Sequence, residues 1–199
     1  MPIKIVSVWN PKGGQGKSML SINIAAAMVQ LGLKPLVICQ DPQGTSMLFF
    51  RGGQLPFTVM EKIPNKKPAA DIIIFDHQAS DWAVPEANML VMPVNPERSQ
   101  YATYIDAYKR AEKENKHIFT VVTNGQNQRP EERKTTKYLL DKGAFVIPAS
   151  GVFSRAAGEY RTIFDEALNK AYKIGQRRKE LLHIAGAILA DKNNGANNE

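Results

Sequence analysis

Residues 3–18 read Ile-Lys-Ile-Val-Ser-Val-Trp-Asn-Pro-Lys-Gly-Gly-Gln-Gly-Lys-Ser, an apolar segment that runs directly into a loop of small and basic residues. The apolar part predicts a buried strand, and the apolar-periodic residues from Gly16 to about residue 30 predict a helix. Between them, the glycines allow backbone N–H groups to curl around an anion, and the dipole of the following helix attracts negative charge. A strand, a glycine-rich loop and a helix in this order are typical of a phosphate-binding loop.

The end of this loop, Gly16-Lys17-Ser18, has the residue types that a nucleoside triphosphate and its metal need. The Lys17 ammonium supplies a point charge to the β- and γ-phosphates, and the Ser18 hydroxyl can reach Mg²⁺. The general pattern GxxxxGK[ST] places a glycine at position 11, where this chain has Pro11, and a second lysine, Lys12, precedes a glycine pair. The predicted nucleotide-binding residues of the loop are Gly13, Gly14, Gln15, Gly16, Lys17, Ser18 and Met19.

The run from Lys12 to Ser18 resembles the deviant Walker A motif of the ParA/MinD class of ATPases, and Asn10-Pro11-Lys12 is similar to the small plasmid ParA proteins. The resemblance implies that Lys12 is a signature lysine, which reaches the phosphates of the ATP bound by the other subunit of a dimer. A lysine supplied in trans makes dimerisation depend on ATP. The resemblance spans roughly residues 3–165, and it implies hydrolysis of ATP to ADP and phosphate with Mg²⁺ as a cofactor.

Two acidic residues at the ends of predicted strands fit this chemistry. The resemblance places Asp41, in the sequence Asp-Pro-Gln-Gly, in a first switch, where its carboxylate orients the attacking water; the same four residues are also a good turn sequence. Asp76 ends the apolar run 71–75, as in a Walker B element, and can hold Mg²⁺ through water or bond to Ser18. The predicted metal site is therefore Ser18, Asp41 and Asp76, and the predicted catalytic residues are Lys12, Lys17 and Asp41.

Two departures from the family pattern concern the rate of hydrolysis. The family usually has an aspartate two residues before Asp41, where this chain has Cys39, and a thiol does not replace a hydrated carboxylate. The alternative to an active ATPase is therefore a slow, nucleotide-dependent binding switch in plasmid transfer or in positioning a protein complex. His77 begins an unusual second switch, His-Gln-Ala-Ser. A histidine beside a phosphate can act in catalysis, but a structural hydrogen bond is the favoured interpretation.

Later segments are predicted to complete the nucleotide site and the dimer. Asn124 follows an apolar run, and the paired donor and acceptor of its amide match the edge of adenine; Asn-Gly is equally a turn signal. Pro148 resembles the stretch whose backbone lines the other side of the base. The sequence Met-Pro-Val-Asn-Pro at 92–96 resembles the family segment that leads into a helix at the dimer interface.

Short apolar runs alternate with helical patterns along the 199 residues, which predicts an α/β three-layer sandwich with a mostly parallel central sheet, a P-loop NTPase fold. The predicted strands are Ile3–Trp9, Pro35–Cys39, Asp71–Phe75, Met89–Val94, His117–Val122 and Ala144–Ile147. The predicted helices lie at about 16–30, 98–114, 130–142, 159–173 and 176–190. Residues 45–68 are predicted as a switch-like loop with one short strand near Phe57–Met60. We expect a single domain over 1–192 and a disordered polar tail over 193–199.

Composition narrows the partners and the compartment. The net charge of +7 favours a polyanion, either nucleic acid or an anionic membrane. The single cysteine excludes an intramolecular disulfide and, with no secretory signal pattern at the N-terminus, predicts a cytoplasmic, nucleoid-associated protein. One cysteine also argues against an iron–sulfur reductase of the same superfamily. No apolar run approaches the length of a membrane span.

The last third of the chain concentrates basic residues, and the resemblance implies that they bind DNA without sequence preference. The alternative is a solvated helix face that keeps the protein soluble. MinD relatives end in a membrane-binding amphipathic helix, whereas residues 181–189 are expected to pack on the sheet. The implied function is partition or positioning of plasmid DNA with a ParB-like adaptor bound at a centromere-like site. The predicted DNA-binding residues are Arg161, Lys170, Lys173, Arg177, Arg178 and Lys179.

Overall fold

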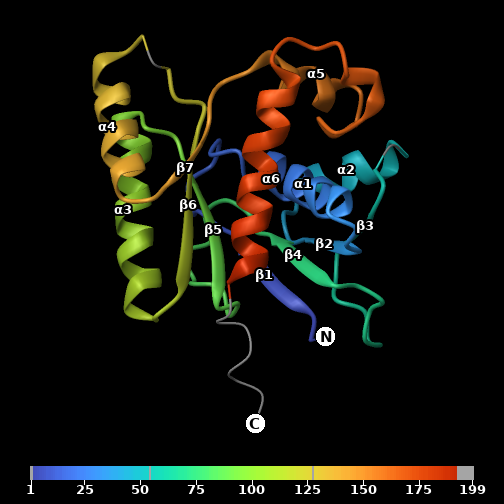
Figure 1. The fold of residues 1–199 in the computed structure, drawn as a ribbon. Helices are drawn as coiled ribbons and strands as arrows, with labels where there is room; N and C mark the ends of the chain where they lie inside the picture. The colour runs from blue at the N-terminus through green and yellow to red at the C-terminus, as the bar shows by residue number, and fades with distance from the viewer. Residues whose placement is uncertain (1, 54, 127, 192–199) are drawn as a thin grey trace.

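A computed structural model describes residues 2–53, 55–126 and 128–191, in which seven strands join one sheet (Figure 1). The strands are ordered β3-β2-β4-β1-β5-β6-β7, and every neighbouring pair is parallel. The six predicted strands and the short strand near residue 58 are confirmed, with small shifts at their ends. They are β1 (Lys4–Val8), β2 (Pro35–Cys39), β3 (Thr58–Met60), β4 (Ile72–Asp76), β5 (Met89–Val94), β6 (His117–Thr123) and β7 (Phe145–Ile147).

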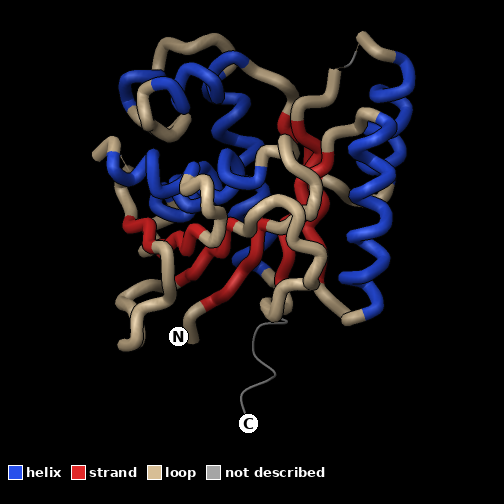
Figure 2. Tube along the Cα trace, turned by 180° about the vertical axis from the view of Figure 1, so that it is seen from behind, coloured by secondary structure: helices blue, strands red, loops and turns tan. Residues whose placement is uncertain are grey.

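Helices lie on both faces of the sheet, which confirms the three-layer α/β architecture (Figure 1). One face carries four helices: α1 (Lys17–Gln30), α2 (Thr45–Arg51), α5 (Gly151–Gly158) and α6 (Ile174–Ala190). The other face carries α3 (Arg98–Lys113) and α4 (Pro130–Asp141). On this second face β2 and β4 are covered by loops instead of helices (Figure 2).

Alternating strand residues fill a separate core on each face. Val6 and Val8 of β1 are fully buried in the core formed with α1 and α6, whereas Leu90 and Met92 of β5 pack with Tyr104 of α3. Strands of such a sheet are apolar on both faces because helices cover both. The predictions from hydrophobic runs therefore succeeded where the strands are buried.

The register of the parallel strands places the functional loops at one edge. Val8 of β1 and Cys39 of β2 both pair with Asp76 of β4, so these three strands end at the same level. In open parallel sheets ligands bind beyond the carboxyl ends of the strands. The loop after β1 and the aspartates at positions 41 and 76 meet at this edge.

The sequence prediction missed α2 within the segment 45–68. Gly44 caps this helix in the left-handed conformation (φ 64°), and Met47 and Phe49 pack against the core. The helix has only seven residues and includes a threonine and two phenylalanines, so its intrinsic propensity is low. Tertiary packing stabilises it, which a local pattern does not reveal.

The predicted helix 159–173 is wrong. α5 ends before it, Tyr160 takes a positive φ of 53°, and only one 3-10 turn, η1 (Glu166–Leu168), precedes α6. The Arg178 guanidinium donates to the carbonyl oxygens of Ile163 (2.8 Å) and Asp165 (2.9 Å), which a continuous helix would use internally. The other four helix predictions are confirmed; the predicted tail 193–199 lies outside the described residues.

Gly52→Ala tests the contact between α2 and the segment after α5. A Cβ on Gly52 would lie 2.4 Å from the Cβ of Tyr160, too close for any side chain to fit without backbone movement. We expect the substitution to lower the free energy of unfolding by about 1–3 kcal/mol, measured by urea denaturation. Gly186→Ala in α6 is the control, because nothing lies within 4 Å of its Cβ position. Equal stabilities for the two variants would contradict the contact.

Candidate functional site

The loop that joins β1 to α1 has the geometry of an anion site. Gly14 and Gly16 have φ values of 75° and 85°, a region that favours glycine. Gly16 caps α1, and no side chain bonds to the helix cap, so the N–H groups of the first turn lie open to a ligand. A helix N-terminus of this kind attracts phosphate through its N–H groups and its dipole.

The two lysines of this loop lie in opposite environments. Lys17 is 7% exposed, and its ammonium donates to the carbonyl oxygen of Lys12 at 3.2 Å. Burial lowers the pKa of Lys17, while the charges of Asp76 and Asp41 act to raise it. The Lys12 side chain is exposed, and its backbone N–H donates to Asn10 Oδ1 at 2.9 Å. One ammonium is thus held inside the loop and the other extends toward solvent.

Two buried amides fix the shape of the loop. Gln15 is fully buried: its Oε1 accepts from the backbone N–H of Asn95 at 2.6 Å, and its Nε2 donates to Gln100 Oε1. Its carbonyl oxygen accepts from the Thr123 hydroxyl at 2.8 Å. Asn10, also buried, donates to a carbonyl oxygen of β5. The Gln15 side chain therefore ties the loop to its neighbours, and Asn10 is a supporting residue that the site prediction left out.

Asp76, the last residue of β4, lies at the centre of a group of hydroxyls. It is fully buried, and it accepts hydrogen bonds from Ser21 (3.1 Å) and from Ser46 of α2, with Ser18 also bonded to it. Burial raises the pKa of Asp76, and the three serine hydrogen bonds act to lower it. The predicted partners Ser18 and Asp76 are thus brought together. Ser21 and Ser46 were missed, Ser46 because it belongs to the unpredicted helix α2.

The donor set around Asp76 fits Mg²⁺ bound together with phosphates. Among the described residues there is no cluster of three or more His, Cys, Asp or Glu side chains that could hold a metal without help. Mg²⁺ commonly uses one or two carboxylates, substrate phosphates and water. Ser18 and Asp76 supply a hydroxyl and a carboxylate beside the phosphate loop, and the negative charge of Asp41 acts on Asp76.

Asp41 lies in a turn after β2 and lines a pocket of about 360 Å³ with Cys39 and Gly44. Its Oδ1 accepts from the backbone N–H of Gln43 at 2.9 Å, and its carbonyl oxygen accepts from that of Gly44 at 2.8 Å. The turn expected of this segment is therefore present, and the charge of Asp41 acts to raise the pKa of Lys17. Cys39 is 4% exposed and pairs with Asp76 in the sheet, and burial raises the pKa of its thiol. A neutral thiol here contributes no negative charge to the site.

His77, directly after Asp76, makes a structural contact. Its Nε2 hydrogen-bonds to the Ser7 hydroxyl of β1 at 2.9 Å. Burial lowers the pKa of His77 from 6.5 to about 4, more than the Asp81 charge raises it. The imidazole is therefore neutral near pH 7 and joins two adjacent strands.

The two residues predicted near adenine lie on neighbouring strands. Asn124 follows Thr123 of β6, Pro148 follows Ile147 of β7, and Thr123 pairs with Ile147 in the sheet. Asn124 is exposed and has a positive φ of 54°, as its turn character predicts. Their placement allows both to face one base, although contact with adenine stays a prediction.

The six predicted DNA-binding residues differ in their exposure to solvent and in whether their charged groups are already paired. Arg177 is 4% exposed, is paired with Glu180 at 3.0 Å and donates to the carbonyl oxygen of Pro148. Arg161 pairs with two nearby carboxylates, and Arg178 bonds to backbone oxygens. Three lysines of the set are exposed: Lys170, Lys173 and Lys179.

Comparisons with known proteins agree with this geometry. A sequence model of a family described as an AAA domain matches residues 3–100. The chromosome partitioning protein ParA of Myxococcus xanthus (strain DK1622) is 31% identical over 72 residues, which are 35% of this chain. The match spans only about a quarter (25%) of the length of that relative.

Two solved structures share the fold. A protein from Borrelia burgdorferi B31, assigned to plasmid partition and bound to AMPPNP, aligns with a TM-score of 0.71 and 19% identity over 92% of this chain and 98% of its own. The septum site-determining protein MinD from Pyrococcus horikoshii OT3, complexed with Mg-ADP, gives a TM-score of 0.71 and 15% identity over 95% and 98% of the chains.

The lowered pKa of His77 predicts a loss of stability in acid. The unfolded chain protonates this histidine below about pH 6.5, whereas the folded chain does so only near pH 4, so the free energy of unfolding falls as the pH falls through this window. Between pH 7 and pH 5 the contribution is at most about 2 kcal/mol. Urea denaturation at both pH values should show a smaller loss for His77→Gln than for the wild type. Identical losses would contradict the buried, neutral imidazole.

Proposed function

We propose that this chain is a P-loop ATPase of the ParA/MinD family, and that it forms an ATP-bridged dimer that binds nonspecific DNA and partitions or positions plasmid DNA. An adaptor protein of the ParB kind, bound at a centromere-like site, stimulates hydrolysis and release. The protein then associates with the nucleoid only in its ATP state. The similarity to a partition protein and to a chromosome partitioning ParA supports this direction.

The contrast between the two loop lysines carries the proposal. Lys17 is buried against its own loop and serves the β- and γ-phosphates of its own subunit. The exposed Lys12 has no such role within the chain, and its backbone is fixed by Asn10. In a dimer whose loops face each other, Lys12 reaches the nucleotide of the partner subunit. The interface is then stable only while the triphosphate is present.

The remaining residues of the site have separate roles in nucleotide binding and in hydrolysis. The backbone of residues 13–19 would cradle the phosphates, and Ser18 and Asp76 would hold Mg²⁺, which would neutralise part of the phosphate charge. Asp41 orients the attacking water from the turn after β2. The side chain of Asn124 and the backbone at Pro148 contact the adenine from adjacent strand ends.

A slow binding switch is the second candidate, and Cys39 favours it. A family member with aspartate at this position would have a further carboxylate beside Asp41, whereas this chain has a neutral, buried thiol. Nucleotide binding and dimerisation do not need that carboxylate, but rapid activation of water does. The protein then acts in plasmid transfer or in positioning a protein complex, with little turnover.

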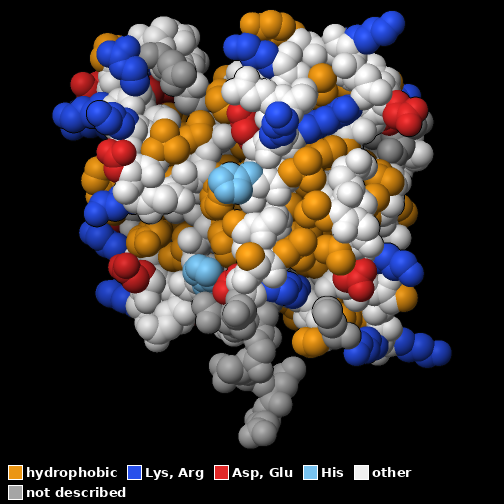
Figure 3. All heavy atoms as spheres, viewed as in Figure 1, with side chains coloured by type: hydrophobic (Ala, Val, Ile, Leu, Met, Phe, Trp, Pro, Cys, Tyr) orange, Lys and Arg blue, Asp and Glu red, His pale blue; other side chains and the backbone are white. Residues whose placement is uncertain are grey.

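The exposed lysines near α6 form the proposed DNA surface. Lys173 lies over the ring of Tyr172, which is 81% exposed, and Lys170 and Lys179 are also exposed. Figure 3 shows Lys and Arg side chains gathered at the end of the molecule where α5 and the start of α6 lie. Lysines in such a patch neutralise phosphates irrespective of sequence. We leave Arg177 out of the surface, because its guanidinium is buried and paired.

A membrane-binding role has less support. In α6 the apolar residues Leu181, Ile184 and Ile188 are fully buried and belong to the same core as α1, as predicted from sequence. An amphipathic helix that binds a membrane needs its apolar face exposed. The described helices include none that could span a bilayer.

Lys12→Ala tests the ATP-bridged dimer. We expect the variant to bind ATP as the wild type does but to stay monomeric, because the missing ammonium acts only across the interface. Light scattering with ATP, ADP and no nucleotide measures the mass, and a fluorescent ATP analogue measures binding. The proposal fails if the variant dimerises with ATP as readily as the wild type.

DNA binding is tested in the same samples by fluorescence anisotropy of a labelled duplex at two salt concentrations. We expect tight binding only with ATP, and a salt dependence whose slope decreases by about one unit for each phosphate-binding lysine that is replaced. A Lys170→Ala/Lys173→Ala/Lys179→Ala variant should bind the duplex more weakly. The control with the same charge change is Lys62→Ala/Lys66→Ala/Lys67→Ala, three exposed lysines in the segment between β3 and β4. If DNA binding is weakened equally in both variants, the loss follows from net charge alone and the proposed DNA surface is contradicted.

A further inference from the structure

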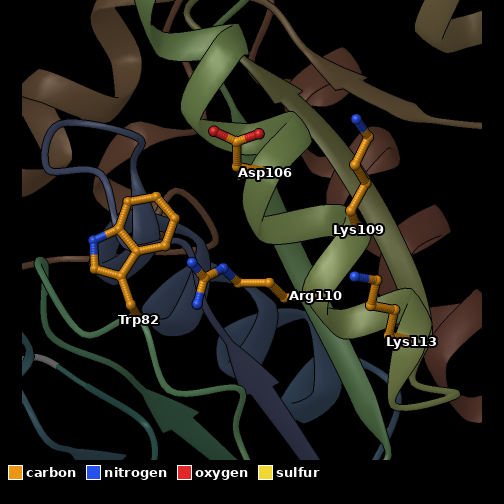
Figure 4. Close-up of a pocket in the computed structure, with 5 residues that line it drawn as sticks. All are labelled: Trp82, Asp106, Lys109, Arg110 and Lys113. Carbon is orange, nitrogen blue, oxygen red and sulfur yellow. The ribbon is translucent and has the colours of Figure 1, made fainter.

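A basic groove lies between α3 and the loop that follows β4, outside the nucleotide site. It has a volume of about 450 Å³ and is lined by Trp82 from the loop and by Asp106, Lys109, Arg110 and Lys113 from α3 (Figure 4). The four α3 residues follow the spacing i, i+3, i+4, i+7, so they form one stripe on the exposed side of the helix. None of these residues takes part in the proposed nucleotide or DNA contacts.

Trp82 gives the groove an apolar wall. Its side chain is 41% exposed, so part of the indole is accessible to a partner. The Arg110 guanidinium lies 5.1 Å from the centre of the ring and points toward it (Figure 4). Trp and Arg side chains together are the commonest energetic anchors of protein interfaces. Lys109 and Lys113 add two charges on the same helix.

The loop that carries Trp82 is tied directly to the phosphate loop. The backbone N–H of Ser80 donates to the carbonyl oxygen of Pro11 at 2.7 Å. The indole N–H of the fully buried Trp9 donates to the carbonyl oxygen of Asp81 at 3.0 Å. Pro11 directly precedes Lys12 and Trp9 lies three residues before it, so a displacement of Trp82 is transmitted to the loop that holds the signature lysine. The groove is thus separate from the nucleotide site but mechanically connected to it.

Charge and shape select an acidic protein segment as the occupant. Three cations against one carboxylate complement a segment rich in Asp and Glu, and the indole complements an aliphatic or aromatic side chain. The surface of a second copy would have to be locally acidic to fit this groove, since the chain as a whole has a net charge of +7. Nucleic acid is the other polyanion that these cations could attract, and it is an outcome of the test below; it is less favoured because Arg110 already lies over the Trp82 ring, where a base would stack.

We propose that the groove between Trp82 and α3 is a docking site for an acidic segment of a partner protein, and that docking changes nucleotide affinity through the loop 80–82. The coupling rests on the proposed nucleotide function, but the docking does not. By reciprocity, nucleotide binding then changes the affinity for the segment by the same factor. The partner thereby responds to the nucleotide state of the ATPase.

Docking is tested with the full chain and a fluorescein-labelled peptide of alternating Glu and Leu, with a Gln–Leu peptide of equal length as the control. Fluorescence anisotropy without nucleotide should show saturable, salt-sensitive binding of the Glu peptide only. We expect Lys109→Glu/Lys113→Glu to weaken it by about tenfold or more, and Trp82→Ala to weaken it as well. Lys62→Glu/Lys66→Glu, with the same change in net charge, should leave the affinity unchanged. Equal affinity for the Glu peptide in all variants would overturn the docking site. So would an oligothymidylate that binds through Lys109 and Lys113 when the peptide does not bind.

Coupling is measured as the affinity for a fluorescent ATP analogue with and without saturating peptide. We expect a change of about fivefold or more in the wild type and none in Trp82→Ala. An unchanged affinity in the wild type would overturn the coupling. A chain that binds the peptide but no ATP would support the docking site and contradict the proposed function, so the two failures are distinguishable.

Discussion

Two buried charged groups, Lys17 at the start of α1 and Asp76 at the end of β4, decide what this edge of the sheet can bind. The Lys17 ammonium and the Asp76 carboxylate are both almost inaccessible, and neither forms an ion pair within the described residues. Lys17 bonds to one carbonyl oxygen and Asp76 to serine hydroxyls. Buried charges without close partners are costly, and a ligand that supplies the opposite charge to each of them removes that cost. A triphosphate with Mg²⁺ would match this need, because its negative charge would compensate Lys17 and its metal ion would compensate Asp76.

The surrounding structure keeps these two charges in place. Gln15 and Asn10 fasten the phosphate loop to β5 and to the connection after it, so the loop does not have to order when a ligand binds. The hydrogen bonds of Ser80 and Asp81 fasten the segment after β4 to the same loop. The loop that carries Trp82 and the loop that carries Lys12 therefore belong to one connected unit. In our proposal, a partner that docks on the exterior of this unit changes nucleotide affinity without contacting the nucleotide.

Much of this arrangement could be predicted from sequence, because the informative signals are local. The order of strand, glycine loop and helix indicated the anion site. Apolar strands that lead to Asp41 and Asp76 indicated the carboxylates beside this site. The hydroxyl of Ser46 could not be predicted, because α2 depends on packing and not on helix propensity. The error at 159–173 has a similar origin: Arg178, distant in sequence, bonds to the carbonyl oxygens there. Likewise the basic residues of the last third of the chain gave six candidates for DNA binding. Only the structure shows that Arg177 is buried and paired whereas Lys173 is exposed.

Equilibrium binding of a fluorescent ATP analogue, with and without Mg²⁺, tests the central claim that the buried Lys17 and Asp76 form a site for a magnesium-bound triphosphate. The wild type should bind with Mg²⁺ and weaken at least tenfold when the metal is removed or when Lys17 is replaced by alanine, a loss of about 1.4 kcal/mol or more. Asp76→Asn should remove the dependence on Mg²⁺. Binding that is indifferent to Mg²⁺ and unchanged in Lys17→Ala would contradict the account.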